Sequence, residues 1–134
     1  MSSALEQLAD TGVIRREPMN DAEYQGLLSS GRSRLLDAQR IDLSHESRFD
    51  LAYNASHALC LAALRRTGYR SSQRHVVFQV LPHTLGLGPE VWRVLDKAHR
   101  VRNTGEYEGF LDVDERLLAD VIGAARRVLE ALER

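Results

Sequence analysis

Apolar residues recur at helical spacing along most of this chain. Between Asn20 and about Ile41 they form one stripe, which consists of Tyr24, Leu28, Gly31, Leu35 and Ala38. Residues three or four apart share one face of an α-helix, so this segment is predicted to be a helix with one buried side. Asn20 is a suitable N-cap, and Glu23 three residues later completes a capping box. Gly31 indicates either a kink or a close contact with another helix.

The next predicted helix, from Ser44 to about Thr67, has the widest apolar surface. Ser44 is its N-cap, and Gly68 follows it as a C′ glycine. Its apolar and small residues cover more than half of the circumference: Phe49, Ala52, Tyr53, Ala55, Ser56, Leu59, Cys60 and Ala63. We therefore expect this helix to be the most buried one, with Cys60 as a structural thiol.

Three further helices are predicted in the second half of the chain. Ser72 opens a short helix that Pro82 interrupts; the valine-rich run within it could also form a strand, but no partner strand is evident. A helix then begins at Pro89 and ends at Asn103, where Asn-Thr-Gly is a stop signal. Asp112 caps the final helix, which has a nearly ideal apolar stripe.

Long helices joined by short turns predict an all-α fold, an up-and-down four-helix bundle with an extra short helix. Residues 1–19 form an N-terminal arm and residues 20–134 form the bundle. No apolar run approaches the roughly 20 residues of a membrane span, and the first residues do not resemble a signal peptide. Together with a single cysteine, these features predict a cytoplasmic protein that is not associated with a membrane.

Arg102 continues a buried stripe. The helix from Pro89 buries Val91, Leu95 and Ala98, and the eleven residues from Val91 to Arg102 correspond to about 1100°, close to three full turns. A charged side chain on an inward face needs a partner or a hydrated cleft. Two interpretations remain open: an ion pair inside the bundle, for example with Asp50, or a ligand-binding cleft.

The net charge of −1 conceals a basic central segment. Residues 65–102 contain eight basic and two acidic side chains, whereas the segments on either side have six against nine and four against eight. A basic segment of this kind fits RNA or a phosphate group as the partner. Solvated helix faces would account for it equally well.

Three features together resemble the short bacterial HEPN proteins, over most of the chain from residue 20. Phe49–Ala58 is similar to a segment of aromatic and small residues in that family, and Gly68 and His75 follow in the expected order. In Ala98–Tyr107, Arg102 matches the arginine of the family's Arg-x(4–6)-His motif. Tyr107 stands where the motif has histidine, as in a subgroup with an acidic–Tyr pair at this place.

The resemblance implies a homodimer in which two copies of the motif helix meet across a cleft, which in active members is a metal-independent ribonuclease site. Arg102 and Tyr107 would then be catalytic residues. His99 could replace Tyr107 as the proton acceptor, because an ordinary tyrosine pKa is near 10. Contacts with nucleic acid are expected from Arg102, Asn103, Arg100, Lys97 and Arg74. No zinc-like spacing or phosphate-binding glycine loop occurs, so neither a metal nor a cofactor is expected.

The leading functional hypothesis is a bacterial HEPN protein of a toxin–antitoxin or RNA-metabolism system. It would bind RNA or a nucleotide and have weak ribonuclease activity. The alternative is a non-catalytic dimeric interaction module that docks a nucleotidyltransferase-like partner protein. Tyr107 favours the alternative, and the basic central segment favours RNA.

Overall fold

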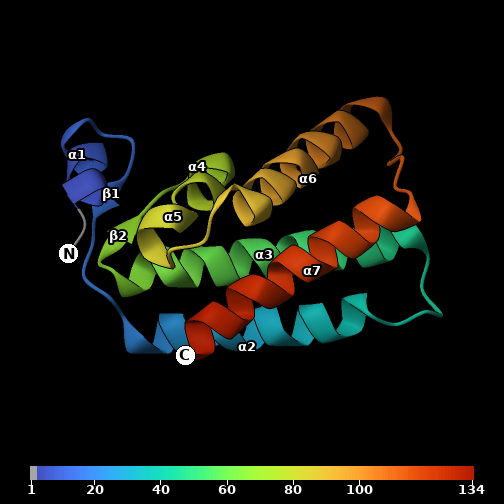
Figure 1. Ribbon diagram of the computed structural model, residues 1–134, viewed down its shortest axis with the longest axis horizontal. Helices are drawn as coiled ribbons and strands as arrows, with labels where there is room; N and C mark the ends of the chain where they lie inside the picture. The colour runs from blue at the N-terminus through green and yellow to red at the C-terminus, as the bar shows by residue number, and fades with distance from the viewer. Residues whose placement is uncertain (1–2) are drawn as a thin grey trace.

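A helical bundle makes up most of the computed structural model, which describes residues 3–134 (Figure 1). Its long helices are α2 (Asp21–Ala38), α3 (His45–Arg66), α6 (Pro89–Glu108) and α7 (Glu115–Glu133). Helix α3 packs against both α2 and α7, and α6 packs against α7 and α3. Two short helices connect α3 to α6: α4 (Arg74–Gln79) and α5 (Leu81–Thr84). The predicted helical bundle is therefore confirmed, and its relation to HEPN domains stays a prediction.

The predicted N-terminal arm is folded onto this bundle; its residues 1 and 2 lie outside the described residues. It forms α1 (Ser3–Asp10) and β1 (Arg15–Arg16), and β1 pairs in antiparallel orientation with β2 (Tyr69–Arg70). Leu5 and Ile14 are each only 2% exposed. The sequence does not indicate this sheet, because strands of two residues are too short to produce an alternating pattern.

The stripe predicted for α2 is buried in full. Asn20 caps this helix as expected, since its Oδ1 accepts a hydrogen bond of 2.9 Å from the Glu23 amide. The helix ends at Ala38, before the predicted Ile41, which is 90% exposed. The four residues after Ala38 are all exposed and do not continue the buried stripe, so the pattern overestimated the length of α2.

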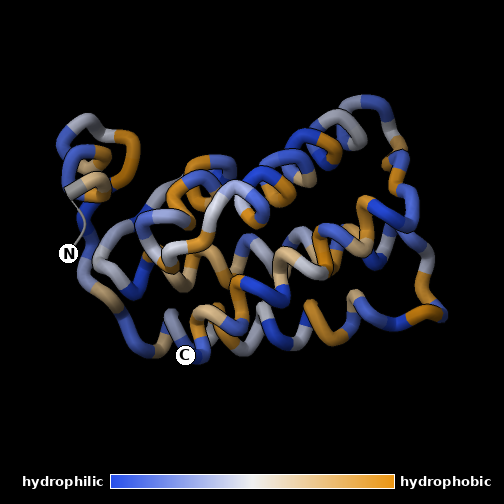
Figure 2. The backbone as a smooth tube through the Cα atoms, viewed as in Figure 1, coloured by the Kyte–Doolittle hydropathy of each residue, from blue (hydrophilic) through white to orange (hydrophobic). Residues whose placement is uncertain are grey.

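Gly31 marks the closest approach between α2 and α3. A Cβ atom at Gly31 would lie 2.5 Å from Cγ of Leu59 on α3. Hydrogen is therefore the only side chain that fits at the present spacing of the two helices. Of the two interpretations of Gly31, the structure supports the close helix contact. Figure 2 shows hydrophobic segments concentrated where the helices face one another.

Helix α3 also matches its prediction closely. The Oγ of Ser44 accepts a hydrogen bond of 3.1 Å from the Ser47 amide, and Gly68 follows the helix with a φ of +92°. Cys60 is completely buried, and burial raises the pKa of its thiol. A thiol that stays protonated is not a nucleophile, so Cys60 is a core residue.

The predicted end of the arginine-bearing helix is wrong. Helix α6 does not stop at Asn103 but continues to Glu108, and Gly109 with a φ of +87° ends it. Gly105 lies inside the helix and is buried, because a Cβ there would lie 2.1 Å from a methyl group of Leu111. The glycine that resembled a stop signal instead allows the following loop to pack against the helix.

The predicted starts of two helices are also wrong. The final helix is capped by Asp114, whose Oδ1 accepts a 2.7 Å hydrogen bond from the Leu117 amide, and not by Asp112. Ser72 does not cap the short helix, which begins at Arg74 without a side-chain cap. Neighbouring residues of similar capping ability make such positions ambiguous in a sequence.

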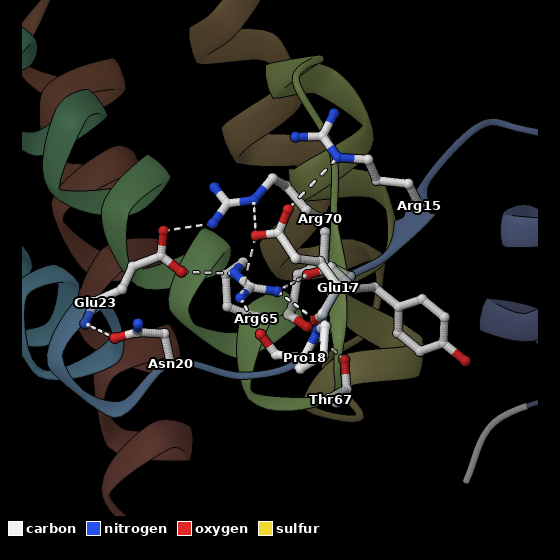
Figure 3. Close-up of polar contacts among 10 residues, drawn as sticks. Arg15, Glu17, Pro18, Asn20, Glu23, Arg65, Thr67 and Arg70 are labelled. Atoms are coloured by element: carbon white, nitrogen blue, oxygen red, sulfur yellow. Dashed lines mark hydrogen bonds and ion pairs between the residues drawn. The ribbon is translucent and has the colours of Figure 1, made fainter.

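An arginine that the sequence analysis overlooked fastens the arm to the bundle. Arg65 on α3 is 1% exposed and donates hydrogen bonds to the carbonyl oxygens of Glu17, at 2.8 Å, and Pro18, at 2.7 Å (Figure 3). Its Nε also donates to the Glu23 carboxylate at 2.7 Å. Arg70 bridges the carboxylates of Glu17 and Glu23. These side chains, Glu17, Glu23, Arg65 and Arg70, are called the Arg65 cluster below.

No helix among residues 3–134 combines the length and the apolar character that crossing a membrane requires.

Candidate functional site

Polar side chains from α3, α4 and α6 surround the ring of Tyr53. Tyr53 itself is completely buried on α3. Its hydroxyl is hydrogen-bonded to Nδ1 of His99 over 2.8 Å, and Nε2 of His99 is 3.1 Å from the Asn103 side-chain nitrogen. His99 and Asn103 are one turn apart on α6, so a hydrogen-bonded chain leads from a buried hydroxyl to the surface.

Arg102 packs over the same ring. Its guanidinium carbon lies 5.1 Å from the Tyr53 ring centroid, within the range of a cation–π interaction. Its Nε is 3.4 Å from the Asp50 carboxylate, and another nitrogen is 2.8 Å from the Glu106 carboxylate. The side chain is 25% exposed, and it borders a cavity of about 260 Å³ with both acids.

Both interpretations of Arg102 therefore describe part of what is observed. The ion pair with Asp50 exists, but Asp50 is 53% exposed, so the pair lies at the surface and not inside the bundle. Surface ion pairs contribute little to stability. An incoming anion could therefore replace the carboxylates at Arg102 at small cost.

Arg74 approaches Tyr53 from α4. Its guanidinium carbon is 5.6 Å from the ring centroid, and it donates a hydrogen bond of 3.2 Å to Oδ1 of Asn54. None of the ion pairs formed within residues 3–134 includes Arg74. Its positive charge is thus held in place by an aromatic ring and an amide, without a neutralising carboxylate. His75, the next residue, has its ring centroid 6.2 Å from that of His99.

These side chains are called the Tyr53 cluster below; its members are Tyr53, Asn54, Arg74, His75, His99, Arg102 and Asn103.

The surroundings of the imidazoles favour their neutral forms. Burial lowers the pKa of His99, and the nearby His75, Arg74 and Arg102 lower it further, partly offset by Asp96. Burial, with smaller contributions from Arg74 and His99, lowers the pKa of His57 to about 4. His57 packs edge-on against Phe78, behind the cluster. Near neutral pH, His99 therefore has one nitrogen that donates and one that accepts a hydrogen bond.

The remaining predicted site residues lie elsewhere on α6. Lys97 and Tyr107 are each five residues from Arg102, which corresponds to about 140° around a helix. Lys97 and Arg100 border a different cavity, of about 490 Å³, that also includes Phe110. Arg100 pairs with Asp96 at 3.4 Å. Tyr107 is 95% exposed. Of the predicted residues, the structure thus brings together Arg74, His99, Arg102 and Asn103 only.

Sequence reasoning missed three members of the cluster. Tyr53 was recognised only as a buried residue, and neither His75 nor Asn54 was predicted as a site residue. The available signal was weak: a polar Asn54 next to Tyr53 on an otherwise apolar helix, and a basic Arg74–His75 pair at the start of a short helix. Tyr53 and His99 are separated by 46 residues, so only the fold joins them.

The arrangement is suited to bind an anion. Two guanidinium groups, two imidazoles and two amides supply hydrogen-bond donors, and no group of three or more potential metal ligands occurs in the described part of the chain. Neither models of known protein families, nor curated proteins, nor solved structures show a match to this chain.

Proposed function

We propose that the Tyr53 cluster binds single-stranded RNA through its phosphate groups. The protein would thereby serve as a bacterial, HEPN-like component of a toxin–antitoxin or RNA-metabolism system. One observation carries the proposal: Arg74 and Arg102 are held within 5.6 Å and 5.1 Å of the same ring centroid, and Arg74 has no carboxylate partner among residues 3–134. The basic character of residues 65–102 supports it.

The fixed positions of the two arginines matter for affinity. A freely moving arginine side chain loses conformational entropy when it binds a ligand, which costs about 2 kcal/mol at most. Packing against Tyr53 removes part of that freedom before the ligand arrives. Each guanidinium can donate two parallel hydrogen bonds to one phosphate. The side-chain amide of Asn103 supplies a further donor next to Arg102.

Slow metal-independent RNA cleavage is part of the proposal. Attack by a 2′-hydroxyl on the adjacent phosphorus forms a cyclic phosphate and breaks the bond to the 5′-oxygen. The step requires a proton acceptor, a proton for the departing 5′-oxygen, which water can supply, and a cation near the phosphorus. His99 is the candidate acceptor, because the lowered pKa keeps its imidazole neutral. Arg102 is the candidate cation. Since both nitrogens of His99 already have hydrogen-bond partners, cleavage is expected to be slow.

Fluorescence anisotropy with a labelled ten-nucleotide RNA tests the binding. Two arginine–phosphate contacts predict that the association constant falls with salt at a logarithmic slope of about −1.4, or roughly sevenfold between 50 and 200 mM. Arg74→Gln should reduce that slope by about 0.7. Arg93→Gln is the matched control, because Arg93 is exposed on α6 and packs on Trp92, away from the Tyr53 cluster. Equal losses in both variants would contradict the proposed site.

A second candidate function rests on the other flank of α6. Tyr107 and Phe110 are 95% and 60% exposed, and Phe110 borders the cavity of about 490 Å³. This surface fits the non-catalytic alternative, a homodimer that docks a nucleotidyltransferase-like protein. Sedimentation at micromolar concentration should then give twice the 15.1 kDa of the monomer, and Phe110→Ser should return the mass to 15.1 kDa. A monomer in both cases excludes the homodimer.

A further inference from the structure

We infer that the Tyr53 cluster selects the phosphorylated end of an RNA strand, a phosphate monoester, over internal phosphodiesters, and that His99 takes up one proton when this end binds. The inference rests on the proposed function, because it assigns a ligand class to the same site.

The first argument is the number of positive groups and donors. An internal phosphodiester has one negative charge and two free oxygens, whereas a monoester has a charge of about −1.5 to −2 and three acceptor oxygens. Arg74 and Arg102 alone can match a diester. His75 and Asn103 provide additional donors within the same cluster. A ligand that uses them all must offer more oxygens and more charge than a diester does.

The second argument is the small surface for nucleobases. Proteins that hold single strands along their length usually stack bases on exposed aromatic rings. The rings of Phe49, Tyr53 and Phe78 at this site are completely buried, whereas Phe110, which borders the cavity at Arg102, is 60% exposed. The site therefore combines contacts to phosphate with one exposed ring beside Arg102, and not with a row of rings along a strand. Such a site is suited to a single terminal group.

The third argument concerns the proton. Charged and titratable groups face His99 from each helix packed around it: Asp96 and Arg102 on α6, Arg74 and His75 on α4, and Tyr53 and His57 on α3. Arg74, Arg102 and His75 oppose a positive charge on the imidazole, and Asp96 offsets them only in part. A bound dianion reverses that balance, because it brings two negative charges next to His99. The imidazole should then become protonated, with both nitrogens donating.

The same chemistry could come from free inorganic phosphate or a mononucleotide. The strand is favoured because residues 65–102 extend the positive charge beyond the cluster, which a small ligand would not need. Competition separates these sources. If a strand end is the ligand, inorganic phosphate and a nucleoside monophosphate should displace a phosphorylated ten-nucleotide RNA only at concentrations at least tenfold higher.

The decisive experiment compares RNAs of one sequence with and without a terminal phosphate, by anisotropy at constant salt from pH 5 to 8. We expect the phosphorylated strands to bind at least tenfold more tightly at pH 6. As the pH rises above the lowered pKa of free His99, their affinity should fall by up to about tenfold per pH unit, because the imidazole must take up a proton when the strand end binds. Below pH 6 it should fall again, because the monoester itself becomes protonated. Unphosphorylated RNA should lack this acid limb.

Two variants test whether His99 is the group that takes up the proton. His99→Gln should abolish the decline of affinity with rising pH, and Arg93→Gln should leave the whole profile unchanged. If His99→Gln does not fold, the pH profiles of the unaltered protein with phosphorylated and unphosphorylated RNA still decide. Equal affinity with and without the terminal phosphate would overturn the inference while leaving RNA binding intact. Failure of every RNA to bind would instead overturn the proposed function.

Discussion

Replacing Arg65 by methionine should destabilise the protein more than the same replacement of any other arginine in the bundle. Methionine preserves most of the volume of the side chain but removes every donor. The carbonyl oxygens of Glu17, Pro18 and Tyr69 then lose a charged donor, and the Glu23 carboxylate retains only Arg70. Breaking a buried ion pair on one side typically costs about 3–5 kcal/mol.

The hydrogen bonds of Arg65 give a second estimate of the loss of stability. Each hydrogen bond to a charged group contributes about 1.5–3 kcal/mol, and Arg65 makes four such bonds. Their sum is an upper limit for the loss of stability, because water can solvate part of the groups that lose a partner. Glu17 and Glu23 are already 38% and 32% exposed, and loosening of the arm exposes them further. We therefore expect a loss of about 4 kcal/mol, which corresponds to a decrease in Tm of roughly 15 °C.

Urea unfolding followed by circular dichroism measures the free energy of unfolding, and limited trypsin digestion reports whether the arm is docked on the bundle. Arg65→Met should accelerate cleavage after Arg15 and Arg16, since β1 is released from β2. Arg66→Met is the matched control: Arg66 is exposed and makes one hydrogen bond of 3.3 Å to the Leu132 carbonyl. It should cost less than about 1 kcal/mol. Similar losses for Arg65→Met and Arg66→Met would refute the reasoning.

Three further predictions concern packing, pH and cleavage. Gly31→Ala should cost about 1–3 kcal/mol in urea unfolding because its Cβ would overlap Leu59, whereas Gly26→Ala, in open space on the same helix, should stabilise by up to about 1 kcal/mol. The pKa of His57 is about 4 in the folded protein against 6.5 unfolded, so stability should fall by up to about 2 kcal/mol from pH 7 to 5; a His57→Gln variant that keeps the full decline would contradict this. Tyr107→His should raise RNA cleavage only if two protomers face each other, because residue 107 lies about 140° from Arg102 around α6; increased cleavage by a protein that sediments as a monomer would disprove that geometry.

Local patterns predicted the parts of this fold that depend on local interactions. The inward stripe of α2 and the caps at Asn20 and Ser44 follow from helical spacing and from hydrogen bonds spanning three residues. The end of α6 could not be predicted in this way. Gly105 has the propensity of a helix terminator, but its contact with Leu111 makes it an interior residue.

The candidate site was predictable only in its α6 half. Arg102 was recognised because a charge on a buried stripe is unusual, and His99 because it lies one turn away. The contacts that give these residues a chemical environment come from Tyr53 and Arg74, which belong to other helices. A sequence read segment by segment contains no information on which helices become neighbours.

The pairing of β1 with β2 has a consequence for how the protein is made. Glu17 leaves the ribosome 53 residues before its partner Arg70. At synthesis rates of about 5–20 residues per second, the arm waits on the order of 3–10 s for its binding site. During that interval Leu5 and Ile14, which end up buried, have no partner strand to cover them. The arm is therefore exposed to chaperones and proteases of the cell until the end of α3 and β2 have been made, and it docks onto segments that are translated later.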